Sequence, residues 1–100
     1  MTPVYSYNLF KEGEDVLLAI CDKNILGKTF ESNDLQITVN EFYKGKECTA
    51  KEALEIARKV TIINAVGNKI ISLLIENEIV NKDMILKIGS VSHAQVIIIK

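Results

Sequence analysis

Six consecutive apolar residues, Val16–Cys21 (VLLAIC), lie between two aspartates and constrain the fold more than any other feature of the chain. The run is far shorter than the roughly 20 residues that a bilayer span needs, and it predicts a β-strand that is buried on both faces. The preceding segment Val4–Phe10 alternates around Tyr5 and Tyr7, and Lys11–Glu14 supplies a turn. The two segments are therefore predicted to form an antiparallel hairpin.

The remaining strands follow from shorter patterns. Asp22 is predicted to cap a short helical turn that Gly27 ends, because its carboxylate can accept from exposed N–H groups and glycine tolerates a positive φ. Residues Leu35–Val39 alternate between apolar and polar side chains, which is typical of a strand with one solvated face. Two more strands are predicted at Ile85–Ile88 and Gln95–Ile99, the second apolar enough for a central position in a covered sheet.

Two helices are predicted between these strands. Thr49–Glu52 (TAKE) matches a capping box, in which Thr and Glu satisfy each other's exposed N–H groups. A second helix is predicted to begin near Asn64, with residues 61–64 forming either a sharp turn or a kink in one long helix. Its apolar residues recur at i, i+4, i+7 and i+8, namely at Val66, Ile70, Leu73 and Leu74. The order of elements predicts an α/β (α+β) fold over residues 1–100 as a single domain, in which a mixed sheet of about five strands carries two helices on one face.

The composition is that of a chain that needs no cross-links. Hydrophobic residues make up 48% of the 100 residues, enough for one core without a disulfide or a structural metal. Cys21 and Cys48 lack C-x-x-C spacing and are too few for a disulfide framework, so free buried thiols are expected. No secretory pattern follows Met1, and a cytoplasmic protein without membrane contact, metal or cofactor is expected.

Charge divides the chain into two unequal parts. Residues 1–56 carry six lysines against ten carboxylates, a balance of −4, whereas residues 57–100 have a balance of +3. The positive half allows a mildly basic face, although an ordinary solvated surface explains the same pattern. The net charge of −1 argues against a strong general affinity for nucleic acid.

Three segments are candidate binding positions. Asn64–Lys69 (NAVGNK) places a capping residue, a glycine and a lysine around the predicted helix start, where N–H groups attract anions. The second glycine and the Lys-Ser/Thr pair of a P-loop are absent, and a plain cap beside a packed strand is the alternative. Lys28 follows a predicted turn, where it could contact a phosphate or could simply be solvated. The third segment, Gly89–Gln95, is predicted to be a polar loop. The candidate binding residues are Lys28, Asn64, Gly67, Lys69, Gly89, His93 and Gln95.

His93 is the only histidine, and it is either a structural hydrogen-bonding group or a functional base. Cys21 could act with His93 as nucleophile and base, since folding can bring such partners together. The alternative is that Cys21 packs as a small hydrophobic residue at the end of its strand. No catalytic residue is assigned on this basis.

Four segments carry a resemblance that covers nearly the whole chain. They are Cys21-Asp22 followed by residues 26–30 (LGKTF), Phe42-Tyr43 with Gly45, residues 57–67 (ARKVTIINAVG), and the G-x-V-x-H-A-Q pattern at 89–95. In these segments the chain resembles an archaeal family of uncharacterised proteins, domain of unknown function 424. Ser92 stands where the family pattern has a proline before the histidine, which predicts a less rigid loop around His93. The resemblance implies an archaeal cytoplasmic protein, implies no reaction, and favours an association with translation.

Three functions are compatible with these patterns. The favoured hypothesis is a translation- or ribosome-associated accessory module that binds RNA or a ribonucleoprotein. The alternative is a protein-interaction or dimerisation domain, pairing through an edge strand such as Leu35–Val39, and a third is an enzyme of unknown reaction that uses Cys21, Asp22 or His93. Asn64, Gly67 and the segment 89–95 are predicted to share one surface. The RNA contact is predicted to run through Arg58, Lys59, Lys69 and His93.

Overall fold

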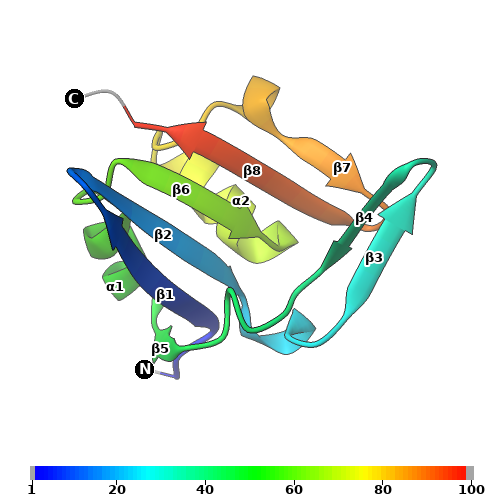
Figure 1. The fold of residues 1–100 in the computed structure, drawn as a ribbon, viewed down its shortest axis with the longest axis horizontal. Helices are drawn as coiled ribbons and strands as arrows, with labels where there is room; N and C mark the ends of the chain where they lie inside the picture. The colour runs from blue at the N-terminus through cyan, green and yellow to red at the C-terminus, as the bar shows by residue number, and fades with distance from the viewer. Residues whose placement is uncertain (1, 99–100) are drawn as a thin grey trace.

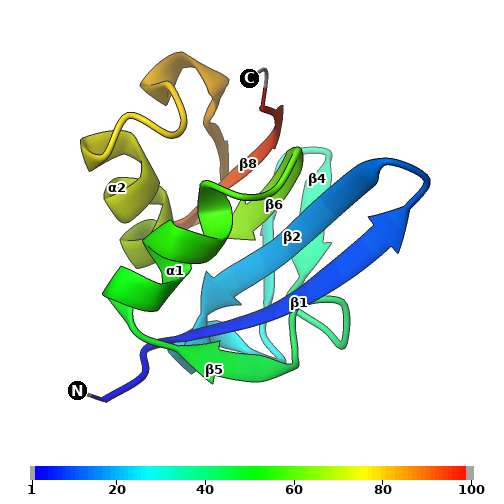
Figure 2. The same cartoon turned by 90° about the vertical axis from the view of Figure 1, so that its left-hand side faces the viewer.

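The structure is a computed structural model that describes residues 2–98, and its main feature is a six-stranded mixed sheet with two helices on one side (Figures 1 and 2). Short 3-10 turns lie at Lys23–Ile25 and Lys82–Met84. The helices are α1 (Ala50–Ala57) and α2 (Asn68–Glu76). The strands are β1 (Tyr5–Glu12), β2 (Asp15–Asp22), β3 (Thr29–Ser32), β4 (Leu35–Thr38), β5 (Lys46–Cys48), β6 (Ile62–Val66), β7 (Leu86–Ile88) and β8 (Val91–Ile97).

The large sheet has the strand order β5-β1-β2-β6-β8-β7, in which only β2 and β6 run parallel. The β1–β2 hairpin predicted from the sequence is confirmed, as are the mixed sheet and the two helices on one face. The sheet has six strands where about five were expected, and β3 and β4 form a separate antiparallel arm. As far as residues 2–98 show, no helix has the length and apolar character needed to span a membrane.

The main core lies between the sheet and the helices. Leu18–Cys21 are fully buried, as the apolar run predicted, because β2 is covered on both faces. The capping box at Thr49 and Glu52 is formed, so α1 begins where the sequence indicated. The buried residues on the helix side come from both helices and from strands β1, β2, β5, β6 and β8, and they include Tyr5, Leu18, Ile20, Cys48, Ala53, Ala57, Ile63, Ala65, Ile70, Leu74, Ala94 and Val96.

The prediction of two consecutive helices is wrong, because residues Ile62–Val66 form the central strand β6. The β-branched run that begins at Thr61 favours a strand, and pairing with β2 on one side and β8 on the other satisfies its backbone. Helix α2 begins only at Asn68, so Asn64 and Val66 are strand residues. Within α2, Leu74 is fully buried, whereas Leu73 is only partly buried.

A second, smaller core lies on the other face of the sheet, beneath the β3–β4 arm. It contains Cys21, Val39 and Tyr43, all buried, together with Ala19, Val66, Ile88 and Val91. The predicted strand at residues 35–39 is present as β4, whereas β3 and β5 were not anticipated. The predicted polar loop at 89–95 reduces to the turn Gly89–Ser90, because β8 already begins at Val91. The last strand is exposed at Gln95 and Ile97, so it is not covered on both faces as expected, and Ile99 lies outside the described residues.

Candidate functional site

The candidate site is the part of the helix-free sheet face that lies beyond the β3–β4 arm. Strand register arranges its side chains in rows, because directly paired residues point to the same side of a sheet. One row is apolar and crosses four strands, from Phe10 through Leu17 and Ile62 to Ile97. The next row holds Asn8, Ala19, Asn64 and Gln95.

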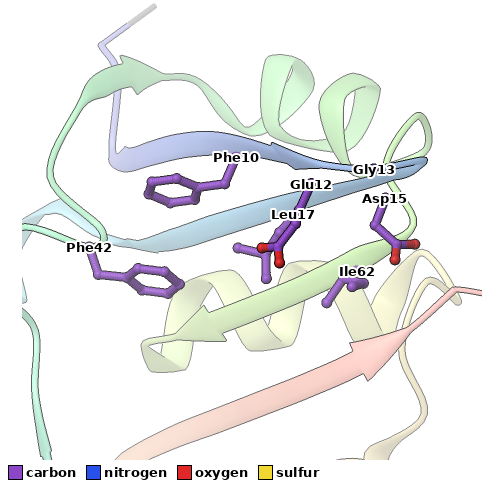
Figure 3. A pocket seen from close by; sticks show the side chains of 7 residues that line it. All are labelled: Phe10, Glu12, Gly13, Asp15, Leu17, Phe42 and Ile62. Carbon is purple, nitrogen blue, oxygen red and sulfur yellow. The ribbon is translucent and has the colours of Figure 1, made fainter.

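The apolar row borders a groove of about 620 Å³ beside the β1–β2 turn. The rings of Phe10 and Phe42 stack with their centroids 5.2 Å apart and an interplanar angle of 7°. These side chains are 42% and 37% exposed, and Ile97 at the end of the row is 75% exposed. Figure 3 shows the two rings toward one end of the groove, the Asp15 carboxylate toward the other, and in this view the Glu12 carboxylate between them, beside Leu17.

Next to the groove lies a polar cluster of Tyr43, Asn64, His93 and Gln95. The Tyr43 hydroxyl donates to Asn64 Oδ1 at 2.6 Å, and the His93 Nε2 atom lies 3.1 Å from the same oxygen. The Asn64 amide donates to Gln95 Oε1 at 3.5 Å. Groove and cluster are contiguous, because Tyr43 packs edge-on against Phe42 with ring centroids 5.1 Å apart. We call the groove and the polar cluster together the open face.

The cluster fixes the chemical state of His93. Because an amide oxygen only accepts hydrogen bonds, Asn64 Oδ1 selects the tautomer that is protonated at Nε2. Burial lowers the pKa of His93 from its ordinary 6.5, so the ring is neutral at pH 7. Its Nδ1 atom is then an acceptor, in a cluster that also contains the side-chain amides of Asn64 and Gln95. This arrangement suits neutral hydrogen bonding to a peptide or a base edge.

Two polar residues of β1 hold the loop that carries Phe42 and Tyr43. The Asn8 amide donates to the carbonyl oxygens of Glu41, Phe42 and Lys44 at 2.7–3.2 Å. The buried Ser6 hydroxyl donates to the Tyr43 carbonyl oxygen at 2.8 Å. Neither residue was predicted from the sequence, in which the alternation of polar positions along β1 is the only signal for them.

The predicted anion site at the second helix start is filled from within the chain. Asp22 accepts from the backbone N–H groups of Lys69 at 3.0 Å and Ile70 at 2.8 Å. Its carboxylate was expected to cap the turn at Lys23–Ile25, where no side-chain cap bond forms. Burial raises the pKa of Asp22, and the two N–H groups act in the opposite direction. Gly67, with φ +128°, permits this approach, since a Cβ there would run into the Asp22 carboxylate.

The structure brings some of the predicted site residues together. Asn64, His93 and Gln95 share the polar cluster, and Gly67 N–H donates to the carbonyl oxygen of Ser92 at 2.9 Å. Gly89 lies in the turn between β7 and β8, against the backbone of Glu31 in β3. The segment 89–95 therefore does adjoin Asn64 and Gly67.

The predicted cations do not gather at this place. Arg58 and Lys59 follow α1 and precede β6, whereas Lys69 follows β6. They lie toward opposite ends of a five-residue strand, roughly 16 Å long at the usual rise per residue. Lys28 is exposed beside the arm, where its carbonyl oxygen accepts from Val39 N–H. Arg58, Lys59 and Lys69 therefore do not form one surface with His93.

Cys21 and His93 are not in a position to act as nucleophile and base. Register places Val66 between them, with Cys21 paired to Val66 and Val66 paired to His93. Cys21 is fully buried, and burial together with the nearby Asp22 charge raises its pKa to about 12. Such a thiol supplies little thiolate at neutral pH.

Comparison with known proteins gives a family and a fold. A family model described as "Protein of unknown function (DUF424)" matches residues 10–99. The crystal structure of an uncharacterized conserved protein from Methanopyrus kandleri is similar, with a TM-score of 0.76 and 28% sequence identity over 95% of this chain and 91% of that chain. No protein of curated function matches the chain.

Proposed function

Since the chain belongs to the DUF424 family of proteins of unknown function, its role has to be inferred from its surface, and we propose that it is a binding module that recognises a partner protein through the open face. The observation that carries this proposal is the apolar row, which is exposed at its two ends, Phe10 and Ile97, and half-buried between them, together with the Phe42 ring that stacks on Phe10. Contiguous exposed apolar surface with a polar border is typical of interaction sites.

The polar cluster supplies what such a site needs for orientation. Asn64, Gln95 and neutral His93 offer donors and acceptors without a net charge. Tyr43, which the loop holds against β1, fixes Asn64 in place. A partner that covers the open face would bury the apolar row and satisfy the cluster, as in the core and rim of a protein interface.

The test is affinity purification of the full chain from its native cells, with and without nuclease. We expect partner proteins that survive nuclease and are lost from a Phe10→Ser, Ile97→Ser double variant. Leu9→Ser is the matched control, because Leu9 is also an exposed apolar strand residue but pairs with Leu18, in the strand row that faces the helices. Partners that are lost equally from the Leu9 variant would contradict the use of the open face.

RNA or a ribonucleoprotein of the translation apparatus is the second candidate partner. It is favoured by a hollow of about 240 Å³ at the start of α2, which Lys23 and Lys69 line together. Phosphate contacts dominate nucleic-acid affinity, and they would use these cations rather than the open face. The measurement is a salt titration of RNA binding: Lys69→Ala is expected to reduce the salt slope by about one unit, and identical slopes would remove Lys69 from the contact.

A further inference from the structure

We propose that the groove on the open face receives an arginine side chain from an extended segment of the partner protein. This inference rests on the proposed function and names the chemistry of the partner. It is carried by two properties of the groove: two carboxylates without a counter-charge, and a stacked aromatic pair that lines the same groove.

The two carboxylates belong to directly paired residues of the β1–β2 hairpin. Glu12 and Asp15 are direct partners in the strand register, and both line the groove. Like charges directly opposite each other on neighbouring strands are destabilising. Within residues 2–98 neither forms an ion pair, and the groove lining includes no lysine or arginine. A cation placed between them would remove this repulsion.

The carboxylate oxygens of Glu12 and Asp15 accept few hydrogen bonds from the described residues. Asp15 Oδ1 accepts from the Thr61 hydroxyl at 3.1 Å, which orients this side chain beside the groove. The described residues provide no hydrogen-bond partner for the Glu12 carboxylate. Several acceptor positions are therefore available to a ligand, and a planar guanidinium can use them with its forked N–H groups.

The rest of the groove fits the other parts of an arginine side chain. Phe10 and Phe42 present exposed rings against which a guanidinium or a neighbouring apolar side chain can stack. Leu17 and Ile62 form an apolar floor suited to the methylene stem. Lysine fits less well, because its ammonium is a strongly hydrated point charge that does not stack as a plane. The two carboxylates disfavour a phosphate backbone, so RNA is not the expected occupant.

The test is an NMR titration of the full-length ¹⁵N-labelled chain with a blocked synthetic peptide, acetyl-Leu-Arg-Leu-amide. The matched probe carries citrulline in place of arginine, which keeps the shape and removes the charge. We expect shifts centred on Phe10, Glu12, Asp15, Leu17 and Ile62, and binding about five- to ten-fold tighter for the arginine peptide.

A Glu12→Gln, Asp15→Asn double variant is expected to abolish this preference for arginine over citrulline. The variant should fold at least as stably as the wild type, because it loses a like-charge pair. Asp34→Asn is the control, since Asp34 is an exposed carboxylate in the turn between β3 and β4. It is expected to leave the preference unchanged.

Three results would overturn the inference: equal affinity for the two peptides, shifts centred elsewhere on the surface, or a short oligouridine that shifts the same groove amides. Failure here is distinguishable from failure of the proposed function. If purification yields partners that depend on the open face while the arginine peptide shows no preference, the binding module stands and the arginine assignment falls. If no partner depends on the open face, the proposed function falls with it.

Discussion

Replacing Asp22 by alanine tests whether a residue at the end of β2 stabilises the distant start of α2. The carboxylate accepts from the N–H groups of Lys69 and Ile70, and the latter bond is buried. Two hydrogen bonds to a charged acceptor would contribute about 3–6 kcal/mol together. Burial raises the pKa of Asp22, which means that desolvation of the charge offsets part of this gain. We therefore expect Asp22→Ala to lower the free energy of unfolding by about 2–4 kcal/mol.

Asp22→Asn refines this prediction, because the amide keeps one acceptor oxygen and turns an N–H group toward the second backbone donor. Its cost is expected to be smaller, about 1–2 kcal/mol. The assay is urea unfolding followed by circular dichroism, together with amide exchange of Lys69 and Ile70. Exchange should accelerate at these two amides before it does so in β2. Glu55→Ala on the exposed side of α1 is the surface control, expected within about 0.5 kcal/mol of the wild type. A loss of less than about 0.5 kcal/mol for Asp22→Ala would refute the long-range cap.

Three further predictions follow from the same structure. Leu74→Ala should cost about 2–5 kcal/mol in chemical denaturation and Leu73→Ala about 1–2, because only Leu74 is fully buried, and the reverse order would contradict the described orientation of α2. Gly67→Ala should cost about 3 kcal/mol or more, since φ +128° is strained for an L side chain and the Cβ would displace Asp22; a near-neutral thermal melt would disprove this steric argument. Burial lowers the pKa of His93 in the folded state, so the unfolded chain binds more protons between the folded pKa and about 6.5. The stability advantage of the wild type over His93→Gln should therefore be complete above pH 6.5 and shrink as the pH falls below it. A pH-independent difference in urea midpoint would show that His93 does not titrate in this way.

Part of the candidate site could be found from the sequence, although for other structural reasons. Asn64 was predicted to cap a helix, and His93 and Gln95 were assigned to a polar loop, whereas all three lie on strands and share one cluster. The groove could not be found, because Phe10, Leu17, Ile62 and Ile97 look like ordinary strand residues. They become a surface only when the register places them in one row.

The sequence by itself determined the local elements whose signals are short-range. The apolar run at Val16–Cys21 required a buried strand, the capping box at Thr49–Glu52 set the start of α1, and the β1–β2 hairpin followed from alternation around a glycine turn. In these cases the stabilising contacts lie within a few residues or depend on hydrophobic burial alone. Such elements can therefore be predicted without knowing which other segments pack against them.

Tertiary structure decided the features for which two local solutions compete. Residues Ile62–Val66 are compatible with a helix stripe or a strand, and the free edges of β2 and β8 select the strand by pairing with its backbone on both sides. Asp22 could cap its own turn, yet its carboxylate reaches α2, because Gly67 leaves room for it beside two unpaired N–H groups. Hydrogen-bond partners 47 and 48 residues away have no signal in the local sequence pattern, and they come within reach only where the folded sheet brings the end of β2 next to the start of α2.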